Sequence, residues 1–283
     1  MNRSDLDGLG YRGKTVVLTG GASGMGEAAA RLLGNLGARV HIADIAEPKV
    51  ACAGYVPVDL GDPASIDAAA GQLKSVGPID FLFPVAGIPP HVLGPLGCML
   101  VNYAGTRRFA EALIPQIREG GSIGLIASVA ARYWQSHLEE SLQVVAIPDF
   151  AGIKAFYEAN PAALRDGYSP SKELLFVWIQ QVAPRLAQER RIRINCTAPC
   201  PVDTAFMEAT IPRMPKGFMA SYPFPLMGRM PTAEEQAWSL ILLSSPLNST
   251  VTGTMLYTDQ GYAGGLVTGA LLPASSNAPP SNS

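Results

Sequence analysis

Charged residues are scarce in this 283-residue chain, and neither sign is in excess. Lys, Arg, Asp and Glu make up 16% of the sequence, and the formal net charge at pH 7 is −2. Proteins that bind nucleic acid or anionic membranes present a basic field, and this composition offers none. No uninterrupted apolar stretch approaches the roughly 20 residues of a membrane-spanning helix. The sequence therefore predicts neither nucleic acid nor membrane as a partner.

Cysteine is also too scattered to suggest a metal centre. Cys196 and Cys200 are close, but no second pair and no nearby histidine completes a zinc site, so we expect no bound metal. With Cys52 and Cys98 they are typical of free thiols in a reducing cytosol. Charged residues precede the first apolar run, which argues against a secretory signal. We therefore expect a cytoplasmic protein.

The few histidines do not indicate catalysis. We place His41 in a strand, His91 in a Pro-rich loop and His137 in a long segment that precedes Tyr168. No G-x-S-x-G motif is present, so the sequence does not favour a Ser-His-acid hydrolase.

Short apolar runs alternate with helix-like stretches in the first half of the chain. Such alternation implies βαβ units, a parallel sheet and right-handed crossovers. The sequence thus predicts an α/β fold: a doubly wound, Rossmann-like parallel sheet with helices on both faces, formed as one domain by residues 1–272. The expected strands are 15–19, 39–44, 55–59, 80–83 and 122–127, and the expected helices are 27–36, 62–74 and 103–118.

Three glycines follow the first expected strand. Gly20 permits a tight turn, and Gly24 and Gly26 permit close backbone approach to a pyrophosphate and close helix–strand packing. The N-terminus of the next helix offers free N–H groups to a phosphate. Asp44 ends the second expected strand, where a carboxylate accepts hydrogen bonds from the ribose hydroxyls and repels a 2′-phosphate. Glu47 adds to that repulsion, so these residues predict NAD rather than NADP.

Tyr168 and Lys172 form a second motif. Residues four apart lie on one face of a helix, so a phenol and an ammonium would point the same way. An ammonium beside a phenol favours the phenolate, which lowers the phenol pKa and makes it a usable general base. Isolated pairs of this kind arise often by chance, so the prediction depends on the other motifs.

In their order along the chain, the motifs resemble the short-chain dehydrogenase/reductase family, from about Lys14 to Gly265. The matching residues are Thr19-Gly20-x-x-x-Gly24-x-Gly26, Asp59, Ala86-Gly87, Asn102, Ser128, Tyr168 and Lys172.

The resemblance implies a catalytic tetrad of Asn102, Ser128, Tyr168 and Lys172. Tyr168 would be the acid/base, and Lys172 would lower its pKa and hold the nicotinamide ribose. Ser128 would orient the substrate oxygen, and Asn102 would position Lys172 and a proton-relay water. The cofactor-binding set implied with them is Gly20, Ser23, Gly24, Met25, Gly26, Asp44, Ile45, Asp59, Leu60, Ala86, Gly87, Tyr168, Lys172, Pro199, Val202 and Thr204.

The chain departs from the family pattern at several places. Pro84-Val85 replaces the usual Asn-Asn, Cys200 replaces the glycine after Pro199, and Gln260 replaces the glycine after Asp259. Cys200 reaches positive φ less easily than glycine, so its turn is expected to differ. The segment between Gly87 and Asn102 is short.

The segment between Ser128 and Tyr168 is unusually long. The shortened and lengthened segments together resemble the coniferyl-alcohol dehydrogenases and the bacterial 3α-hydroxysteroid dehydrogenases/carbonyl reductases. The insertion, about 131–166, contains two stretches of near-helical apolar spacing that Ile147-Pro148 separates. It could be a surface hairpin, a wall over the substrate or a cover over an oligomer surface. As a cover it would leave a dimer that uses another face, although a tetramer stays possible.

A Met-rich segment, about 201–231, is interpreted as a lid over a hydrophobic substrate. Ordinary packing is an equally good interpretation for any single methionine. Trp134, Met207 and Tyr222, with Ser128, are the predicted substrate-binding residues. The tail, 273–283, is expected to be flexible.

Taken together, we expect an NAD(H)-dependent oxidoreductase that acts on a small hydrophobic alcohol (aryl or allylic, alicyclic or hydroxysteroid) and its ketone or aldehyde. A non-catalytic dinucleotide-binding regulator or scaffold is the alternative.

Overall fold

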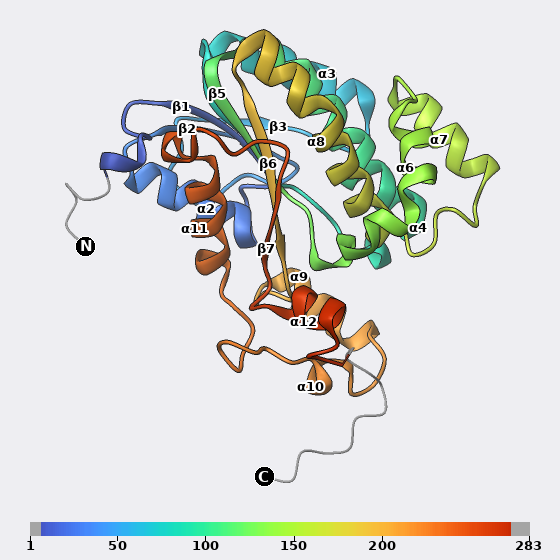
Figure 1. The fold of residues 1–283 in the computed structure, drawn as a ribbon. Coiled ribbons are helices and arrows are strands. Elements are labelled where there is room, and N and C mark those ends of the chain that lie inside the picture. The colour runs from blue at the N-terminus through green and yellow to red at the C-terminus, as the bar shows by residue number, and fades with distance from the viewer. Residues whose placement is uncertain (1–6, 273–283) are drawn as a thin grey trace.

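A seven-stranded parallel sheet forms the centre of the molecule in the computed structural model, which describes residues 7–272 (Figure 1). The strand order is β3-β2-β1-β4-β5-β6-β7, and every neighbouring pair runs parallel. The predicted tail, 273–283, lies outside the described residues. The strands are β1 (Thr15–Thr19), β2 (Arg39–Asp44), β3 (Gly54–Pro57), β4 (Ile79–Pro84), β5 (Ile117–Ile126), β6 (Arg193–Pro199) and β7 (Met255–Thr258).

Helices cover both faces of this sheet. The α-helices are α2 (Gly24–Asn35), α3 (Pro63–Leu73), α4 (Pro90–Met99), α5 (Thr106–Leu113), α6 (Leu138–Val145), α7 (Phe150–Ala159), α8 (Tyr168–Arg190), α9 (Ala205–Thr210), α10 (Phe218–Ser221), α11 (Ala233–Ser244) and α12 (Tyr262–Thr268). In Figure 1, α2 and α11 lie on one side of the strands and α3 and α8 on the other. The predicted doubly wound fold is confirmed.

Two apolar cores fill the space between sheet and helices, one on each face. Leu18 of β1 and Phe83 of β4 pack against α2 and α11, whereas Val17 and Leu82 of the same strands face the core that holds α8. Successive strand residues point to opposite faces, so strands buried on both sides read as continuous apolar runs. The strand order reverses between β1 and β4, which places a ligand crevice at their carboxyl ends.

The predicted helix 103–118 is wrong at its C-terminal end. The chain forms a π-helix, Leu100–Gly105, then α5, and β5 already begins at Ile117. Pro115 lacks the N–H that a continuing helix needs, so the helix ends ahead of it. The predicted third strand also runs too far: β3 ends at Pro57, and the N–H of Asp59 already bonds the Ser65 hydroxyl at 2.9 Å.

His91 lies in a helix rather than in the predicted loop. Pro90 is the first residue of α4, where its missing N–H costs nothing. The helix is interrupted at Leu93 and Gly94, whose φ is +70°, ahead of Pro95. Prolines therefore start and kink this helix instead of excluding it.

The predicted pair of helices in the insertion is confirmed as α6 and α7. Val144, Ile153 and Tyr157 are buried in the same core as α8, so the insertion is not a detached surface hairpin. Arg107 of α5 donates hydrogen bonds of 3.0 Å to the carbonyls of Val145 and Ile147, which joins α5 to the end of α6. Figure 1 shows α6 and α7 on the outer side of α8.

Candidate functional site

Tyr168 is the first residue of α8, and Gly167 is the N-cap residue before it. Gly167 has a φ of +72°, and a Cβ there would overlap the Pro95 carbonyl of α4. Lys172 lies one turn later, with its Nζ 5.7 Å from the centroid of the Tyr168 ring. The prediction that the two side chains share one helix face is confirmed by this contact.

The Lys172 ammonium is buried. Its Nζ donates a hydrogen bond of 3.0 Å to the Ile126 carbonyl at the end of β5. Burial lowers the pKa of Lys172 to about 8, because an ammonium removed from water is disfavoured; the thiols of Cys98 and Cys196 oppose that change.

The expected lowering of the Tyr168 pKa does not occur in this state. Burial raises the pKa of the half-buried Tyr168 to about 12, and a hydrogen bond with Ser128 works in the opposite direction. Lys172 is not among the causes of this shift; its Nζ donates to the Ile126 carbonyl and stays 5.7 Å from the ring. The prediction from sequence was wrong because it considered the lysine charge and left out the burial of both groups.

Ser128 and Asn102 complete the cluster. Ser128 follows β5 and begins a 3₁₀ helix, Val129–His137, in which its Oγ accepts the Ala130 N–H at 3.1 Å. The Asn102 amide is fixed on the Ile88 backbone: its Oδ1 accepts the Ile88 N–H at 2.8 Å, and its Nδ2 donates to the Ile88 carbonyl at 2.9 Å.

Gly87 lies close to both Asn102 and Lys172. A Cβ on this residue would stand 3.3 Å from the Asn102 Oδ1 and 3.5 Å from the Lys172 Nζ. Gly87 is exposed, so the backbone between the two polar groups is open to a ligand. The structure therefore brings all four predicted tetrad residues to the carboxyl end of the sheet, beside an accessible glycine.

The glycine turn forms the other half of the site. Gly20 has a φ of +75°, and a Cβ there would lie 2.6 Å from the Ala86 Cα; a Cβ on Gly26 would overlap the Gly20 carbonyl. Gly24, with a φ of +57°, has Thr204 as its nearest neighbour, at 3.7 Å from a built Cβ. The glycine turn therefore lies opposite Thr204, which was predicted to contact the cofactor. Ser23 and Met25 lie within the same turn and first helical residues.

Asp44 is joined to this turn. Its Oδ2 accepts the Ala22 N–H at 2.9 Å and its Oδ1 accepts the Ala46 N–H at 3.0 Å. The neighbouring Ile45 is 74% exposed, an apolar side chain at the rim of the crevice. The carboxylate is therefore held at the strand end where sequence reasoning placed it.

Asp59 and Leu60 lie farther along the same rim. The Asp59 Oδ1 accepts the Gly61 N–H at 2.7 Å, which shapes the turn into α3. The Leu60 side chain is buried in the core, so only its backbone is available to a cofactor.

The family departures leave this geometry intact. Pro84 is still paired with Thr19 in the sheet, and Val85 packs into the core beside α2. Cys200, after Pro199, is not among the non-glycine residues of the described chain that have positive φ. It is buried against Tyr222 and Tyr262, so the thiol fills space in the lid region. That this turn differs from the turn of the family stays a prediction.

The predicted substrate residues are dispersed. Met207, in α9, is buried, as is Val202, which follows β6. Tyr222 is buried between Tyr262 and Phe224, at ring-centroid distances of 4.4 and 4.9 Å, and its hydroxyl finds no partner within the described chain. Trp134 packs edge-on against Phe176 at 5.1 Å on the outer part of α8. They do not form one contiguous wall.

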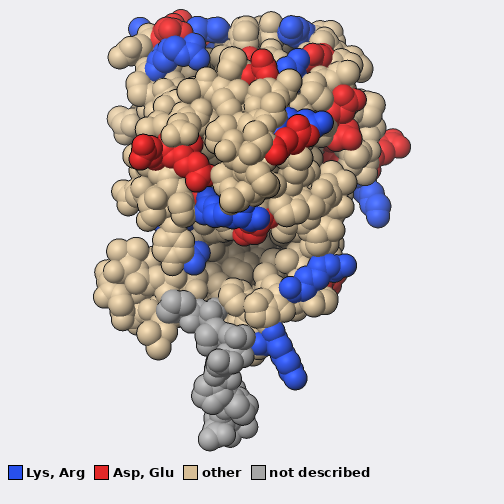
Figure 2. All heavy atoms as spheres, turned by 90° about the vertical axis from the view of Figure 1, so that its right-hand side faces the viewer, with Lys and Arg blue, Asp and Glu red and all other residues tan. Residues whose placement is uncertain are grey.

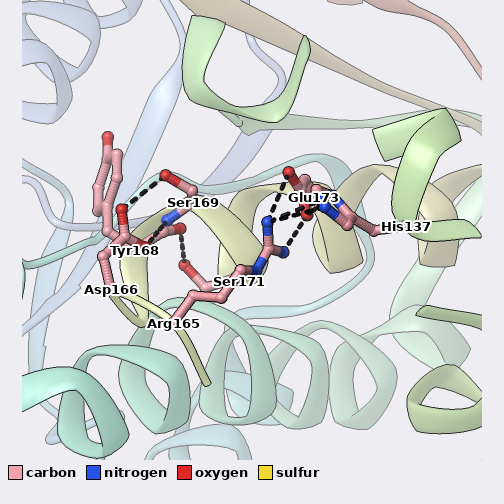
Figure 3. A network of polar contacts seen from close by, with 7 residues as sticks. All are labelled: His137, Arg165, Asp166, Tyr168, Ser169, Ser171 and Glu173. Atoms are coloured by element: carbon pink, nitrogen blue, oxygen red, sulfur yellow. Dashed lines mark hydrogen bonds and ion pairs between the residues drawn. The ribbon is translucent and has the colours of Figure 1, made fainter. Parts of the chain in front are cut away.

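Sequence reasoning missed two groups of polar residues. Cys98 lies beside Asn102, whose Nδ2 is 3.2 Å from its Sγ. Glu173 is 1% exposed and is paired with Arg165 and His137 (Figure 3). The sequence does contain a signal for Glu173, because this charged residue directly precedes the apolar run Leu174-Leu175-Phe176-Val177-Trp178.

Other classes of site gain no support from residues 7–272. That part of the chain contains no group of three or more His, Cys, Asp or Glu side chains placed to hold a metal ion. Nor does it contain a helix that is long and apolar enough to cross a membrane.

Comparison with known proteins agrees with this geometry. Residues 14–139 match a family model described as short chain dehydrogenase, and residues 153–263 match one described as Enoyl-(Acyl carrier protein) reductase. The two matches leave out part of the insertion. A coniferyl-alcohol dehydrogenase from a Pseudomonas species is 34% identical over 194 residues, which cover 69% of this chain and 75% of that protein. This chain belongs to the short-chain dehydrogenase/reductase family.

Other relatives extend the match to nearly the full length. Dehydrogenase/reductase SDR family member 6 from Danio rerio is 30% identical over 272 residues, covering 88% of this chain and 97% of its own. A 3-alpha-hydroxysteroid dehydrogenase from a Pseudomonas species, solved with NADH, has a TM-score of 0.72 at 22% identity and covers 92% of this chain and 100% of its own, which shows a shared fold. This short-chain dehydrogenase/reductase is therefore an oxidoreductase, and the predicted family resemblance is confirmed.

Gln260 replaces a family glycine and connects the lid region to the sheet. Its φ of +63° falls in the left-handed region that disfavours side chains. Its side-chain amide accepts the Met227 N–H and donates to the Arg229 carbonyl, both at 2.9 Å. We infer that these two bonds hold residues 227–229 and offset the backbone cost.

We predict different effects for two substitutions at this position. Gln260→Gly relieves the backbone cost while it removes both amide bonds, so stability should change little. Gln260→Ala keeps the cost and loses the bonds, and should destabilise by about 1 kcal/mol or more. In both variants, hydrogen exchange of residues 224–230 should accelerate. Unchanged exchange in both would show that Gln260 does not hold this segment.

Proposed function

We propose that this protein is an NAD(H)-dependent dehydrogenase that interconverts a hydrophobic alcohol (aryl or allylic, alicyclic or hydroxysteroid) and its ketone or aldehyde. The observation that carries the proposal is one polar cluster: Asn102 and Lys172 flank exposed Gly87, and Tyr168 lies beside Lys172 and Ser128. A dinucleotide-binding scaffold needs the glycine turn but has no use for such a polar cluster.

The residues present fit a dinucleotide. Gly20 and Gly26 pack too tightly against the protein's own backbone to carry a side chain. Gly24 has no neighbour closer than Thr204, at 3.7 Å from a built Cβ, so its backbone can approach a pyrophosphate. The N-terminus of α2 directly follows, with Ser23 at its N-cap making no side-chain hydrogen bond to the helix. Lys172 and Asn102 flank Gly87; Lys172 would hold the nicotinamide ribose and Asn102 would position Lys172, with Pro199, Val202 and Thr204 beside the carboxamide.

When bound, the nicotinamide supplies the hydride acceptor or donor, and the protein supplies orientation and proton transfer. Tyr168 holds a proton on its Oη at neutral pH because burial raises its pKa to about 12. It can therefore donate that proton to a carbonyl oxygen in the reductive direction, which leaves a phenolate. In the oxidative direction Tyr168 must first lose its own proton, and the phenolate then accepts the proton of the alcohol. Ser128 hydrogen-bonds the same phenol and orients the substrate oxygen. Lys172 would bring positive charge to the ribose, while its Nζ stays 5.7 Å from the centroid of the Tyr168 ring.

Asp44 supports NAD over NADP. The carboxylate is fixed by the N–H groups of Ala22 and Ala46, so it cannot easily turn away from a 2′-phosphate. Glu47 stands exposed on the same loop and adds negative charge. No Arg or Lys occurs between Asp44 and Pro48 to neutralise a phosphate.

A hydrophobic substrate is supported by the surface around the site. Figure 2 shows a hollow between the main body of the molecule and the lower part, where Figure 1 places α9, α10 and α12; uncharged residues form its floor, and charged side chains of both signs stand at its rim. Relatives named for coniferyl alcohol and for a 3α-hydroxysteroid act on hydrophobic alcohols. We propose an alcohol of that class, with Met207 and Tyr222 on the lid side.

Tyr168→Phe should abolish turnover and leave cofactor binding almost unchanged. The phenylalanine ring keeps the packing against Phe206, which lies at a centroid distance of 6.1 Å, but it has no proton to transfer. We expect kcat to fall by about 10³-fold or more, as read from the absorbance of reduced nicotinamide. The dissociation constant of NAD should stay within about threefold. Retained turnover would overturn the assignment of Tyr168 as the acid/base.

Asp44→Asn should shift cofactor preference towards NADP. The amide oxygen can still accept the Ala22 N–H, whereas the amide nitrogen cannot accept the Ala46 N–H, so the substitution removes the charge and one of the two backbone hydrogen bonds. We expect the ratio of kcat/KM for NADP to that for NAD to rise by about 30-fold, which corresponds to ~2 kcal/mol of relieved repulsion. Glu47→Gln, on the same exposed loop, is the matched control and should change the ratio far less. Equal ratios in all three proteins would contradict the role of Asp44.

We also propose that the protein is a dimer that does not use the outer face of α8. The insertion covers this face, because Val144 of α6 and Tyr157 of α7 share its core. Light scattering combined with size-exclusion chromatography should give the mass of two chains. A tetramer whose subunits meet through α8 would contradict the proposal.

A further inference from the structure

Glu173 is a buried carboxylate one residue beyond Lys172. Its side chain is 1% exposed, although Leu174, Leu175 and Trp178 beside it on α8 are apolar core residues. A buried charge is costly unless it is paired and hydrogen-bonded. Its partners therefore indicate which parts of the structure depend on it.

Both partners come from the insertion, one from each end. His137 closes the 3₁₀ helix that leaves the site after Ser128, and its Nδ1 lies 3.1 Å from a Glu173 carboxylate oxygen. Arg165 lies on the returning segment, just before Tyr168, and its guanidinium contacts both Glu173 oxygens. Figure 3 shows His137 and Arg165 converging on Glu173. The carboxylate thus joins the outgoing and the returning segments at the base of the insertion.

The returning segment leads directly into Tyr168. Arg165 has a φ of +48°, a left-handed conformation that a non-glycine residue keeps only when its surroundings hold it. The next residue, Asp166, accepts hydrogen bonds of 2.7 Å from the Ser169 N–H and hydroxyl (Figure 3). Gly167 then packs against the Pro95 carbonyl of α4. These contacts therefore restrain the backbone conformation from Arg165 to Ser169.

We propose that the Glu173–Arg165–His137 cluster is a positioning device that fixes Tyr168 relative to Ser128 across the insertion. The insertion separates these two residues by 40 positions, and both ends of it are attached to the same carboxylate. Glu173 lies on the helix that carries Tyr168 and Lys172, so movement of either insertion end changes the geometry at the phenol. Glu173 itself does not touch the reacting atoms. The inference rests on the proposed function of Tyr168 and Ser128.

The other polar groups near the cluster do not take the place of Glu173 as the partner of Arg165 and His137. Tyr157 of α7 lies close enough for Glu140, Arg165 and Glu173 to influence its pKa, which burial raises. Glu140 and Asp166 also act on the pKa of Arg165, but neither forms an ion pair with it within residues 7–272. Within residues 7–272, Glu173 is therefore the one carboxylate that contacts both the Arg165 guanidinium and the His137 imidazole.

Glu173→Gln, Arg165→Met and Arg165→Lys test the device. Glutamine keeps the shape of the side chain without its charge, and lysine keeps the cation without the forked contact. We expect Glu173→Gln and Arg165→Met to lower kcat by about 10²-fold, the loss that a displacement of about 1 Å at a reacting group produces. KM and the dissociation constant of NAD should change by less than about threefold. Arg165→Lys should recover part of kcat.

Arg107→Met is the matched control. Arg107 also anchors the insertion, through the Val145 and Ile147 carbonyls, but within residues 7–272 it forms no hydrogen bond or ion pair with Glu173 or Arg165. This variant should lower the midpoint of thermal unfolding and leave kcat per folded molecule within about twofold. A general loss of insertion packing would instead lower kcat in the control as well.

Hydrogen exchange without cofactor supplies a readout that does not depend on activity. Exchange at residues 165–172 should be faster in Glu173→Gln and Arg165→Met than in the wild type or in Arg107→Met. If Glu173→Gln does not fold, the two Arg165 variants carry the test. Wild-type kcat and wild-type exchange in the folded variants would overturn the inference. Turnover by Tyr168→Phe would instead overturn the proposed function and leave the exchange result as the measure of positioning.

Discussion

The hydrogen bond from the buried Lys172 ammonium to the Ile126 carbonyl is the interaction on which the rest of the site depends. It ties the first turn of α8 to the end of β5, only two residues before Ser128. Because the helix begins at Tyr168, this one bond fixes the phenol, the ammonium and the serine hydroxyl around a common point. Burial lowers the pKa of Lys172 to about 8, so the fold retains an ammonium in a place that disfavours its charge. Such a cost is typical of functional sites.

The insertion separates Ser128 from Tyr168 along the chain, and specific side-chain contacts attach it to the rest of the fold. Arg107 joins one end of α6 to α5, and the pairs between Glu173 and Arg165 and between Glu173 and His137 close the base. The lid region is attached in a similar manner, through Gln260 and through Arg229, which pairs with Glu235 at 2.8 Å. Charged or amide side chains therefore hold the insertion and the lid region, while the sheet itself relies on apolar packing.

The sequence predicted the parts of the molecule that follow from local chemistry. Gly20 and Gly26 leave no room for side chains, and Tyr168 and Lys172 lie one helical turn apart, so pattern and spacing were sufficient. Tertiary effects were not predictable in this way. The end of α5 and the start of β5 depend on Pro115 and on strand pairing. The Tyr168 pKa depends on burial by segments far apart in the chain, and the partners of Glu173 lie 8 and 36 positions away.

A structure determined with NAD and a bound ketone or alcohol is the most direct test of the account. It predicts that the substrate oxygen lies within hydrogen-bond distance, about 2.6–3.2 Å, of both the Tyr168 Oη and the Ser128 Oγ. It also predicts that the nicotinamide ribose contacts the Lys172 Nζ. A substrate oxygen bound away from Tyr168, or a nicotinamide that does not reach Lys172, would contradict the central claim.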